Sequence, residues 1–208
     1  MQHAVILAHP SPASFNASAA KAWAEAAGEL GHEVHVRDLY AIGFEPRLAA
    51  SELPWAPHFA PGEDVREERK IIARSDVLVL VYPLWFNAPP AILKGYVERV
   101  LGFGFAYGPA GTGTQPLLTG KMLVSITTSG APNAWAARTK ALEHLRAGFD
   151  DHLAAVCGLT VLEHQHFGNV RPGIRPDAVE GMLTDVRRLA RRLFGGSRKG
   201  AEPRTTVG

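Results

Sequence analysis

Two large aromatic residues follow directly after the most apolar run of the chain, where a ligand could bind. Residues 77–82, VLVLVY, form a continuous run typical of a strand buried on both faces of a parallel sheet. A proline ends this strand, because it has no N–H to donate, and Trp85 and Phe86 come next. Ligands of open α/β sheets bind in the crevice beyond such strand ends. The two rings are therefore expected either to stack on a flat heterocycle or to cover the sheet edge as core.

Hydroxyl and amide side chains gather in a second loop, just before a predicted helix. Ser11, Ser14 and Asn16 follow the first apolar run of the chain. A helix N-terminus offers unpaired N–H groups and a positive dipole end, which suit a phosphate. Neither G-x-x-x-x-G-K-[ST] nor G-x-G-x-x-G occurs here, which weighs against a P-loop and against a conventional dinucleotide-binding domain. The alternative is that Ser14 or Asn16 only caps the helix.

A third loop, residues 127–133, TTSGAPN, is small and polar. Its backbone N–H groups could approach the edge of a ligand closely, although a plain turn would have the same composition. Together the three loops could hold a phosphate, the face of a flat ring and the polar edge of that ring. This combination matches a flavin.

The alternation of strand and helix patterns indicates how these loops are brought together. Strands are predicted at 3–8, 33–39, 77–82, 121–128 and 158–165, and helices at 16–30, 65–74, 90–101, 134–156 (with a break at Gly148) and 176–194. Residues 41–64 contain four prolines and are expected to be irregular. The pattern predicts the α/β class, with a three-layer, doubly wound, five-stranded parallel sheet. By analogy, the expected strand order is the flavodoxin-like order 2-1-3-4-5. Residues 1–194 are expected to form one domain and 195–208 a disordered tail.

Composition narrows the functional classes. The chain has 208 residues, 22 basic and 20 acidic, with a net charge of +2, so nothing favours nucleic acid as a partner. No apolar segment is long enough for membrane insertion and no signal-peptide pattern is present. The single cysteine, Cys157, cannot form an internal disulfide and is expected in the core. A cytoplasmic location is the expectation.

Six motifs carry a resemblance to a known family. They are AHPSPASFN at 8–16, RDLY at 37–40, YPLWFNAPPAILKGYVERVL at 82–101, GFAYG at 104–108, GKMLVSITTSG at 120–130 and, more loosely, CGLTVLEHQHFG at 157–168. In this order and spacing the chain resembles the NAD(P)H:quinone oxidoreductase family of flavodoxin-like flavoproteins, the DT-diaphorase type and its smaller bacterial relatives. The first five motifs cover most of residues 3–130.

The resemblance implies a cofactor, a reaction and an assembly. The family transfers hydride from NAD(P)H through flavin N5 to a quinone in a ping-pong cycle, as a homodimer with its site at the subunit interface. The implied cofactor-binding residues are His9, Ser11, Phe15 and Asn16 around the phosphate, Pro83, Leu84, Trp85, Phe86 and Asn87 along the ring, and Thr127, Thr128, Ser129 and Gly130 at its polar edge. No metal is implied.

The chain departs from the family at residues that matter for catalysis. DT-diaphorase has a tyrosine and, six residues later, a histidine that are thought to relay a proton, but Trp135 and Ala141 stand at these positions. Trp135 and His144, one helical turn further on, are the candidates for a catalytic role, and an exposed helix histidine is the alternative for His144. Asn87 replaces a family aromatic residue, which indicates a more polar or differently shaped pocket. A shorter carboxy-terminal part leaves FMN as an alternative to FAD.

Other functions remain open. An azo- or nitro-compound reductase would use the same site, and a regulatory flavoprotein subunit of a potassium efflux system would share the fold. A one-electron carrier of the flavodoxin type is disfavoured, because such carriers are strongly acidic. His164 and His166 alternate on the last strand and could bind a metal, but no third ligand is evident. A substrate contact or a surface position is the preferred interpretation for this pair.

Overall fold

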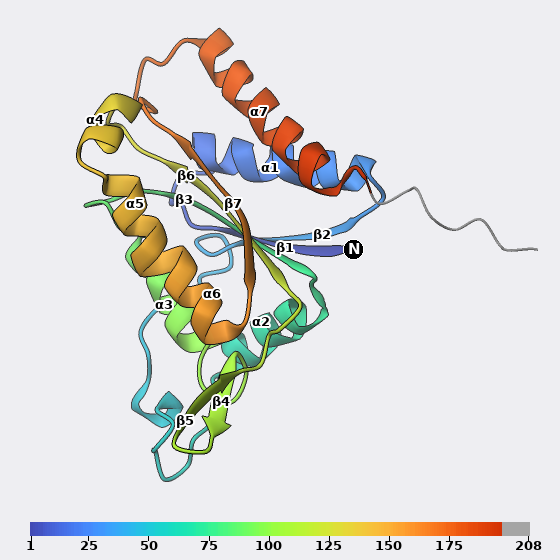
Figure 1. Ribbon diagram of the computed structural model, residues 1–208, viewed down its shortest axis with the longest axis vertical. Helices are drawn as coiled ribbons and strands as arrows, with labels where there is room; N and C mark the ends of the chain where they lie inside the picture. Colours follow the sequence, from blue (N-terminus) through green and yellow to red (C-terminus); the bar gives the residue numbers. More distant parts are fainter. Residues whose placement is uncertain (197–208) are drawn as a thin grey trace, which may run out of the picture.

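The computed structural model describes residues 1–196 and has a five-stranded parallel sheet between two layers of helices (Figure 1). The strands are β1 (Gln2–Leu7), β2 (Glu33–Asp38), β3 (Val77–Pro83), β6 (Met122–Thr128) and β7 (Thr160–Phe167). Their spatial order is β2-β1-β3-β6-β7, and every pairing is parallel. Counted along the sheet strands alone this is the order 2-1-3-4-5, so the predicted fold class is confirmed. The single domain expected over 1–194 stays a prediction, and of the expected tail only Gly195 and Gly196 fall within the described residues.

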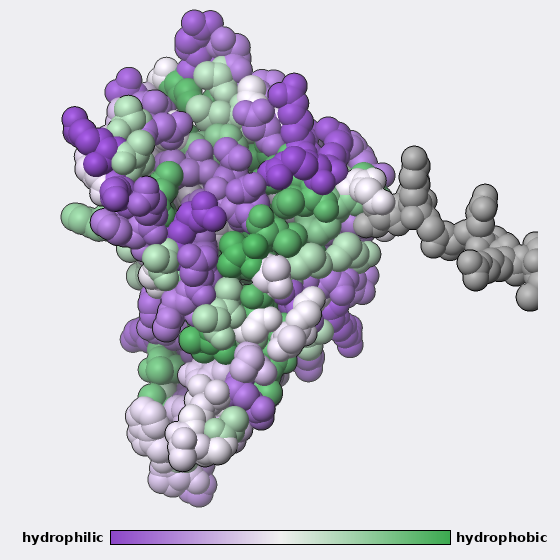
Figure 2. All heavy atoms as spheres, in the orientation of Figure 1, coloured by the Kyte–Doolittle hydropathy of each residue, from purple (hydrophilic) through white to green (hydrophobic). Residues whose placement is uncertain are grey.

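The helices divide between the two faces of the sheet. One face carries α1 (Phe15–Glu29) and α7 (Pro176–Phe194), and the other carries α2 (Glu63–Arg74), α3 (Ala91–Val100) and the segment from α5 (Ala141–Leu145) to α6 (His152–Cys157). Figure 2 shows mainly hydrophilic residues on the outer sides of α7 and α5, with apolar surface between these layers along the sheet edge. Among the described residues no helix combines the length and apolar character needed to cross a membrane.

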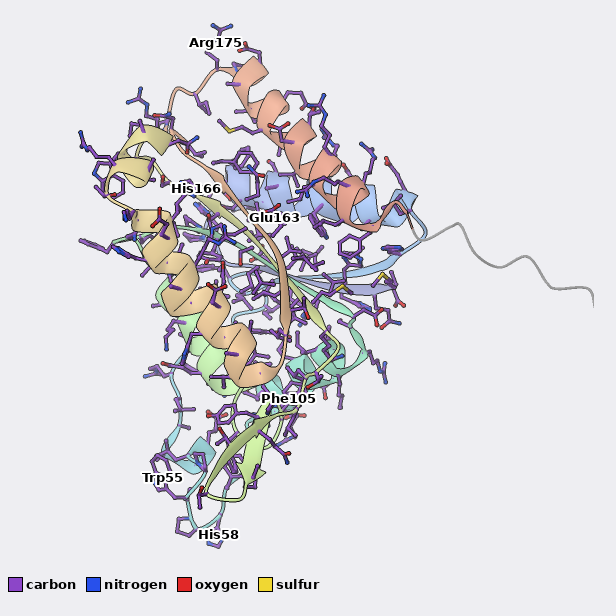
Figure 3. The ribbon with its side chains drawn as sticks, viewed as in Figure 1. Trp55, His58, Phe105, Glu163, His166 and Arg175 are labelled. Carbon is purple, nitrogen blue, oxygen red and sulfur yellow. The ribbon has the colours of Figure 1, made fainter. Side chains whose placement is uncertain are left out.

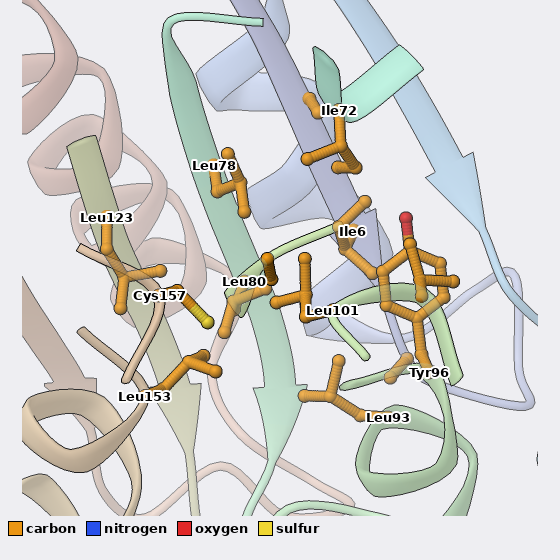
Figure 4. Close-up of a cluster of buried hydrophobic side chains, with 14 of the residues drawn as sticks. Ile6, Ile72, Leu78, Leu80, Leu93, Tyr96, Leu101, Leu123, Leu153 and Cys157 are labelled. Carbon is orange, nitrogen blue, oxygen red and sulfur yellow. The ribbon is translucent and has the colours of Figure 1, made fainter. Parts of the chain in front are cut away.

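The central strand β3 shows why the sheet needs both layers. Alternate side chains of a strand point to opposite faces. Leu78 and Leu80 (Figure 4), together with Tyr82, accordingly pack towards α3 and α6. Val79 and Val81 pack towards α1 and α7. Every residue of β3 is buried. A strand covered on both faces is what the uninterrupted apolar run predicted.

Cys157 also lies in this core, at the end of α6 (Figure 4). Burial raises the pKa of its thiol to about 11, so the thiolate form is suppressed at neutral pH. The expectation of a packed core cysteine is confirmed.

The segment predicted as one long helix at 134–156 is divided differently. It consists of α4 (Asn133–Arg138), α5, a π-helical turn η2 (Arg146–Asp151) and α6. The break falls at Lys140, which has a left-handed backbone (φ 54°), rather than at Gly148, which lies within η2. The predicted break at Gly148 was therefore wrong. The last strand runs two residues later than predicted, because Gly158 (φ 80°) ends α6 before the chain can extend.

Two short strands were not predicted. The hairpin β4 (Tyr107–Ala110) and β5 (Gly113–Pro116) lies apart from the main sheet (Figure 1). Its glycines and prolines and the absence of alternating apolar residues hide it from pattern analysis. The long connection at 41–64 is irregular, as expected, apart from the 3₁₀ turn η1 (Ala50–Glu52).

A buried ion-pair network ties this irregular connection to the fold. The Arg99 guanidinium on α3 donates to both carboxylate oxygens of Glu52, at 2.8 Å each, and to those of Asp64 at 2.6 and 3.0 Å. The side chains of Arg99 and Glu52 are only 6% and 5% exposed. Ion pairs therefore hold in place a connection that lacks regular backbone hydrogen bonding.

The same connection crosses α3 so closely that one helix position must be glycine. A Cβ added at Gly95 would overlap the backbone carbonyl of Pro46. We expect Gly95→Ala to lower the free energy of unfolding by about 1–3 kcal/mol, even though alanine favours helix. The control is Gly181→Ala on α7, where the added methyl meets nothing within 4 Å and stability should be unchanged or slightly higher. Equal urea midpoints for the two variants would contradict this close approach.

Candidate functional site

Three loops meet at the carboxyl end of the sheet and enclose a cavity of about 510 Å³. They follow β1, β3 and β6, the strands whose ends were predicted to converge. The cavity is lined by ten of the predicted cofactor-binding residues: His9, Ser11, Phe15, Asn16, Pro83, Leu84, Trp85, Thr128, Ser129 and Gly130. Its volume lies within the ordinary range for small-molecule and cofactor sites.

The amino end of α1 forms one wall of the cavity. Ser14 caps the helix, since its Oγ accepts a hydrogen bond from the Ala17 N–H at 3.1 Å. The N–H groups of Phe15 and Asn16 have no protein acceptor among the described residues. The first turn contains no acidic side chain. This wall therefore combines free N–H donors with the positive end of the helix dipole, as an anion requires.

Side chains around α1 fix this wall in place. Asn16 is buried and does not cap the helix; its Nδ2 donates to Thr128 Oγ1 at 3.0 Å and links the first loop to the third. His9 Nδ1 accepts from the Ser11 N–H at 3.0 Å. Burial lowers the pKa of His9 below its ordinary value, so its ring is neutral at pH 7.

Trp85 and Phe86 have separate positions. Trp85 lines the cavity, is 44% exposed, and its ring centroid lies 6.2 Å from that of His9. Phe86 and Asn87 form a tight turn with left-handed backbones (φ 51° and 56°), closed by hydrogen bonds between Trp85 and Ala88. The Phe86 ring is fully exposed outside the cavity. A phenylalanine held in this conformation is strained by about 1–2 kcal/mol.

Asn87 points away from the cavity. Its Nδ2 donates to the Ala141 carbonyl at 3.1 Å, and it lines a neighbouring hollow of about 360 Å³ together with His144. Neither of the two catalytic candidates lines the main cavity: His144 is exposed on α5, and Trp135 is 40% exposed on α4. The structure thus separates Phe86, Asn87, Trp135 and His144 from the other predicted residues.

A buried polar cluster lies behind the third loop. Of its members, the sequence analysis considered His164 and His166 as a pair but did not predict the cluster. Thr127 lies under the loop rather than in the cavity, and its Oγ1 lies 2.8 Å from His164 Nε2 and 2.9 Å from His166 Nδ1. Ser129, which lines the cavity, is 3.1 Å from His166 Nε2. His164 is also hydrogen-bonded to the buried carboxylate of Asp150.

A surface position for His164 is therefore wrong, because the side chain is buried between the sheet and η2. Burial, followed by the charge of His164, lowers the pKa of His166 to about 4. No group of three His, Cys, Asp or Glu side chains suited to a metal occurs within residues 1–196.

Some lining residues gave no sequence signal. Val170, Arg171, Pro172, Ile174 and Val179 complete the cavity from the loop after β7 and the start of α7. The Arg171 side chain brings a positive charge to the cavity, which suits the same anion as the α1 wall. This loop lies beyond the last motif of the resemblance, so only the tertiary structure places it at the site.

Comparisons with known proteins identify the family and its fold. Residues 1–190 match a protein family described as having a flavodoxin-like fold. A protein of Haemophilus influenzae called an uncharacterized NAD(P)H oxidoreductase is 35% identical over 171 residues, which are 82% of this chain and 85% of that one. NAD(P)H dehydrogenase [quinone] 1 of Rattus norvegicus is 30% identical over 204 residues, 85% of this chain and 73% of that one. The structure of NAD(P)H:quinone oxidoreductase from Methanothermobacter marburgensis superposes with a TM-score of 0.81 at 28% identity, covering 93% and 98% of the two chains.

Proposed function

The chain belongs to the flavodoxin-like fold family that includes NAD(P)H:quinone oxidoreductases, and on this premise we propose that it is a flavin-dependent enzyme that reduces quinones by two electrons at the expense of NAD(P)H. The observation that carries the proposal is the shared cavity beyond β1, β3 and β6. It offers an anion-binding helix end, an aromatic wall and a polar loop in one place. These are the three recognition elements that a flavin needs.

Each wall has its own part in holding the cofactor. The N–H groups of Phe15 and Asn16 would bind the phosphate, with Ser11, His9 and Arg171 around it. Leu84 and Trp85 would lie against the ring, and the Thr128–Gly130 loop would meet its polar edge. A flavin bound there supplies hydride transfer through N5, while the protein positions the substrate and stabilises charge at the polar edge.

The finer features of the proposal concern cofactor, assembly and location. The cofactor is FMN or FAD, and the donor is NADH or NADPH. A second copy of the chain is proposed to complete the site, because Phe86 and Trp135 expose apolar rings beside it. Such exposed aromatic rings are typical of protein interfaces. The protein is proposed to work in the cytoplasm.

Steady-state kinetics test the proposed activity. Protein loaded with flavin should oxidise NAD(P)H continuously, beyond one equivalent, only when an acceptor is present, with parallel double-reciprocal lines for donor and quinone, as a ping-pong cycle requires. An azo or nitro compound as the acceptor tests the sister activity in the same cavity. Turnover that is absent with all three acceptors, despite bound flavin, would instead favour a regulatory role.

Ser11 tests the phosphate wall with little risk to the fold, because its side chain is exposed at the cavity. A carboxylate introduced by Ser11→Glu would repel the phosphate, and we expect the flavin dissociation constant to rise roughly 10–100-fold at low salt. High salt should reduce the difference. Ser51→Glu adds the same charge to an exposed serine of η1 outside the cavity and serves as the control. Equal flavin affinities for both variants would contradict a phosphate site at Ser11.

A further inference from the structure

A continuous chain of hydrogen bonds runs from the interior of the protein to the cavity. Asp150 Oδ2 is hydrogen-bonded to His164 Nδ1, and His164 Nε2 lies 2.8 Å from Thr127 Oγ1. The same oxygen is 2.9 Å from His166 Nδ1, and His166 Nε2 is 3.1 Å from Ser129 Oγ. Asp150, His164 and Thr127 are buried, whereas Ser129 is half-buried and lines the cavity.

The pairing of β6 with β7 places three members of this hydrogen-bonded chain on one face of the sheet. Thr127 pairs with His166 across the parallel strands β6 and β7, and Ser125 pairs with His164, so their side chains share one face of the sheet. Asp150 reaches this face from the π-helical turn η2, and its Oδ1 also accepts from Ser125 Oγ at 2.9 Å. Isolated π-helical turns within α-helices occur frequently at functional sites. Here the wider turn carries a carboxylate to His164.

The hydrogen-bond chemistry allows the chain only two complete arrangements. Each hydroxyl has one hydrogen, and a neutral imidazole has one donor and one acceptor nitrogen. When His164 is protonated on both nitrogens, every donor along the chain points towards Ser129. When His164 has lost the Nε2 proton, every donor points back towards Asp150. A single proton therefore switches the direction of the whole chain.

We propose that Ser129, His166, Thr127 and His164 conduct a proton between the cavity and a reservoir formed by His164 and Asp150. This inference rests on the proposed function, because the proton would neutralise the negative charge that hydride transfer leaves on the bound ligand. Ser129 is the residue that touches the ligand. The other members act through it.

The transfer balances in protons and moves no electrons within the chain. Ser129 Oγ gives its proton to an anionic oxygen or nitrogen of the bound ligand and receives the Nε2 proton of His166. His166 Nδ1 takes the Thr127 proton, and Thr127 takes the Nε2 proton of His164. The ligand gains one proton and His164 becomes neutral, still donating through Nδ1 to the Asp150 carboxylate. Uptake of one proton from water restores the starting state.

The surroundings favour this path over a simple structural role. The low pKa of His166, about 4, means that this ring passes a proton on rather than holding it. Tyr82 of β3 faces the same region, and burial, together with Asp150, raises the pKa of its phenol, which therefore stays neutral. Its hydroxyl is buried with no hydrogen-bond partner among the described residues. Glu163 lies on the opposite face of β7 and is paired with Arg192 at 2.8 Å, so it does not enter the chain (Figure 3).

Two variants of neighbouring residues give a matched test. Asp150→Asn keeps the shape of the reservoir and removes its charge, whereas Asp151→Asn changes the exposed acid next to it. In flavin-loaded enzyme, kcat should fall as the pH rises, because the hydrogen-bonded chain from Asp150 to Ser129 then loses the proton that it conducts. We expect Asp150→Asn to move this fall to lower pH by about one unit or more, with KM for NAD(P)H unchanged. Asp151→Asn should follow the wild-type profile, and identical profiles for both variants would overturn the proposal.

A second readout needs neither flavin nor turnover. Histidine ¹⁵N NMR of the flavin-free wild type should show one of the two arrangements: a doubly protonated His164 with the Nε2–H tautomer of His166, or the Nδ1–H tautomer of both rings. Thr127→Val removes the hydroxyl that His164 and His166 share, and we expect both imidazole rings to become mixtures of tautomers. Unchanged signals would show that the proposed chain of hydrogen bonds does not exist. If Asp150→Asn does not fold, Ser129→Ala removes the exit hydroxyl and should abolish the same dependence of kcat on pH. A wild-type protein that binds no flavin would contradict the proposed function. The NMR result would still decide whether the chain of hydrogen bonds exists.

Discussion

Trp85→Ala is expected to raise the dissociation constant for flavin by roughly 10–100-fold. The side chain forms the aromatic wall of the cavity and leaves 44% of its surface exposed for a ligand to cover. Loss of a large stacked ring removes about 1.5–3 kcal/mol of apolar burial and aromatic contact. Fluorescence titration of the flavin-free protein with FMN and with FAD measures the change. The wild-type titrations also show which of the two cofactors binds more tightly.

Trp55→Ala is the matched control for this experiment. Trp55 is 78% exposed and lies far from the cavity, near the β4–β5 hairpin (Figure 3). The Trp55→Ala variant should therefore bind flavin with the affinity of the wild type. If the two variants have the same affinity, Trp85 does not contact the ring and the central role of the loop after β3 is lost.

The largest effect on stability is expected from Arg99→Met. This change leaves the Glu52 carboxylate buried without its guanidinium partner, and breaking a buried ion pair in this way costs about 3–5 kcal/mol. Urea unfolding at neutral pH measures the difference. Arg47→Met is the control, because Arg47 makes a similar two-bond contact with Glu45 at the surface, where water screens the charges. Equal losses for the two variants would contradict the structural role of the buried network.

The same network predicts a dependence of wild-type stability on pH. Burial alone would raise the pKa of Glu52, but hydrogen bonds from Arg99 and from the N–H groups of Gly62 and Ala49 lower it to about 2. An unfolded glutamate titrates near 4.3. The stabilisation is therefore complete above about pH 5 and declines as the pH falls towards 2. In Arg99→Met this acid-dependent loss of stability should be smaller.

The loops of the site could be predicted because they depend on the ends of strands. Once the apolar run before Trp85 is recognised as a strand of a parallel sheet, its carboxyl end must lie beside those of the neighbouring strands. Ser11 and Ser129 are far apart in the sequence, yet both were expected at this edge and both line the cavity. The alternation of strands and helices indicated a doubly wound sheet, and the strand order was predicted by analogy with flavodoxin-like folds.

What could not be predicted depends on local backbone conformation or on tertiary contacts. Phenylalanine has no preference for a left-handed backbone, so nothing in the sequence indicated that Phe86 turns away from the cavity. Asp150 lies in a helical segment without any motif, and only the π-helical turn brings it to His164. Arg171 reaches the site from a loop that backbone hydrogen bonds hold against the loop after β6, since the N–H groups of Asn169 and Val170 donate to that loop.

The most direct test of the account is an anaerobic spectral titration of the purified protein. The protein is loaded with flavin, and its visible absorbance is followed while NADPH and then a quinone are added. We predict that one equivalent of NADPH bleaches the flavin absorbance and that one equivalent of quinone restores it. A protein that remains colourless in the presence of added flavin, or whose bound flavin does not respond to NADPH or NADH, would contradict the proposed function and leave only the fold.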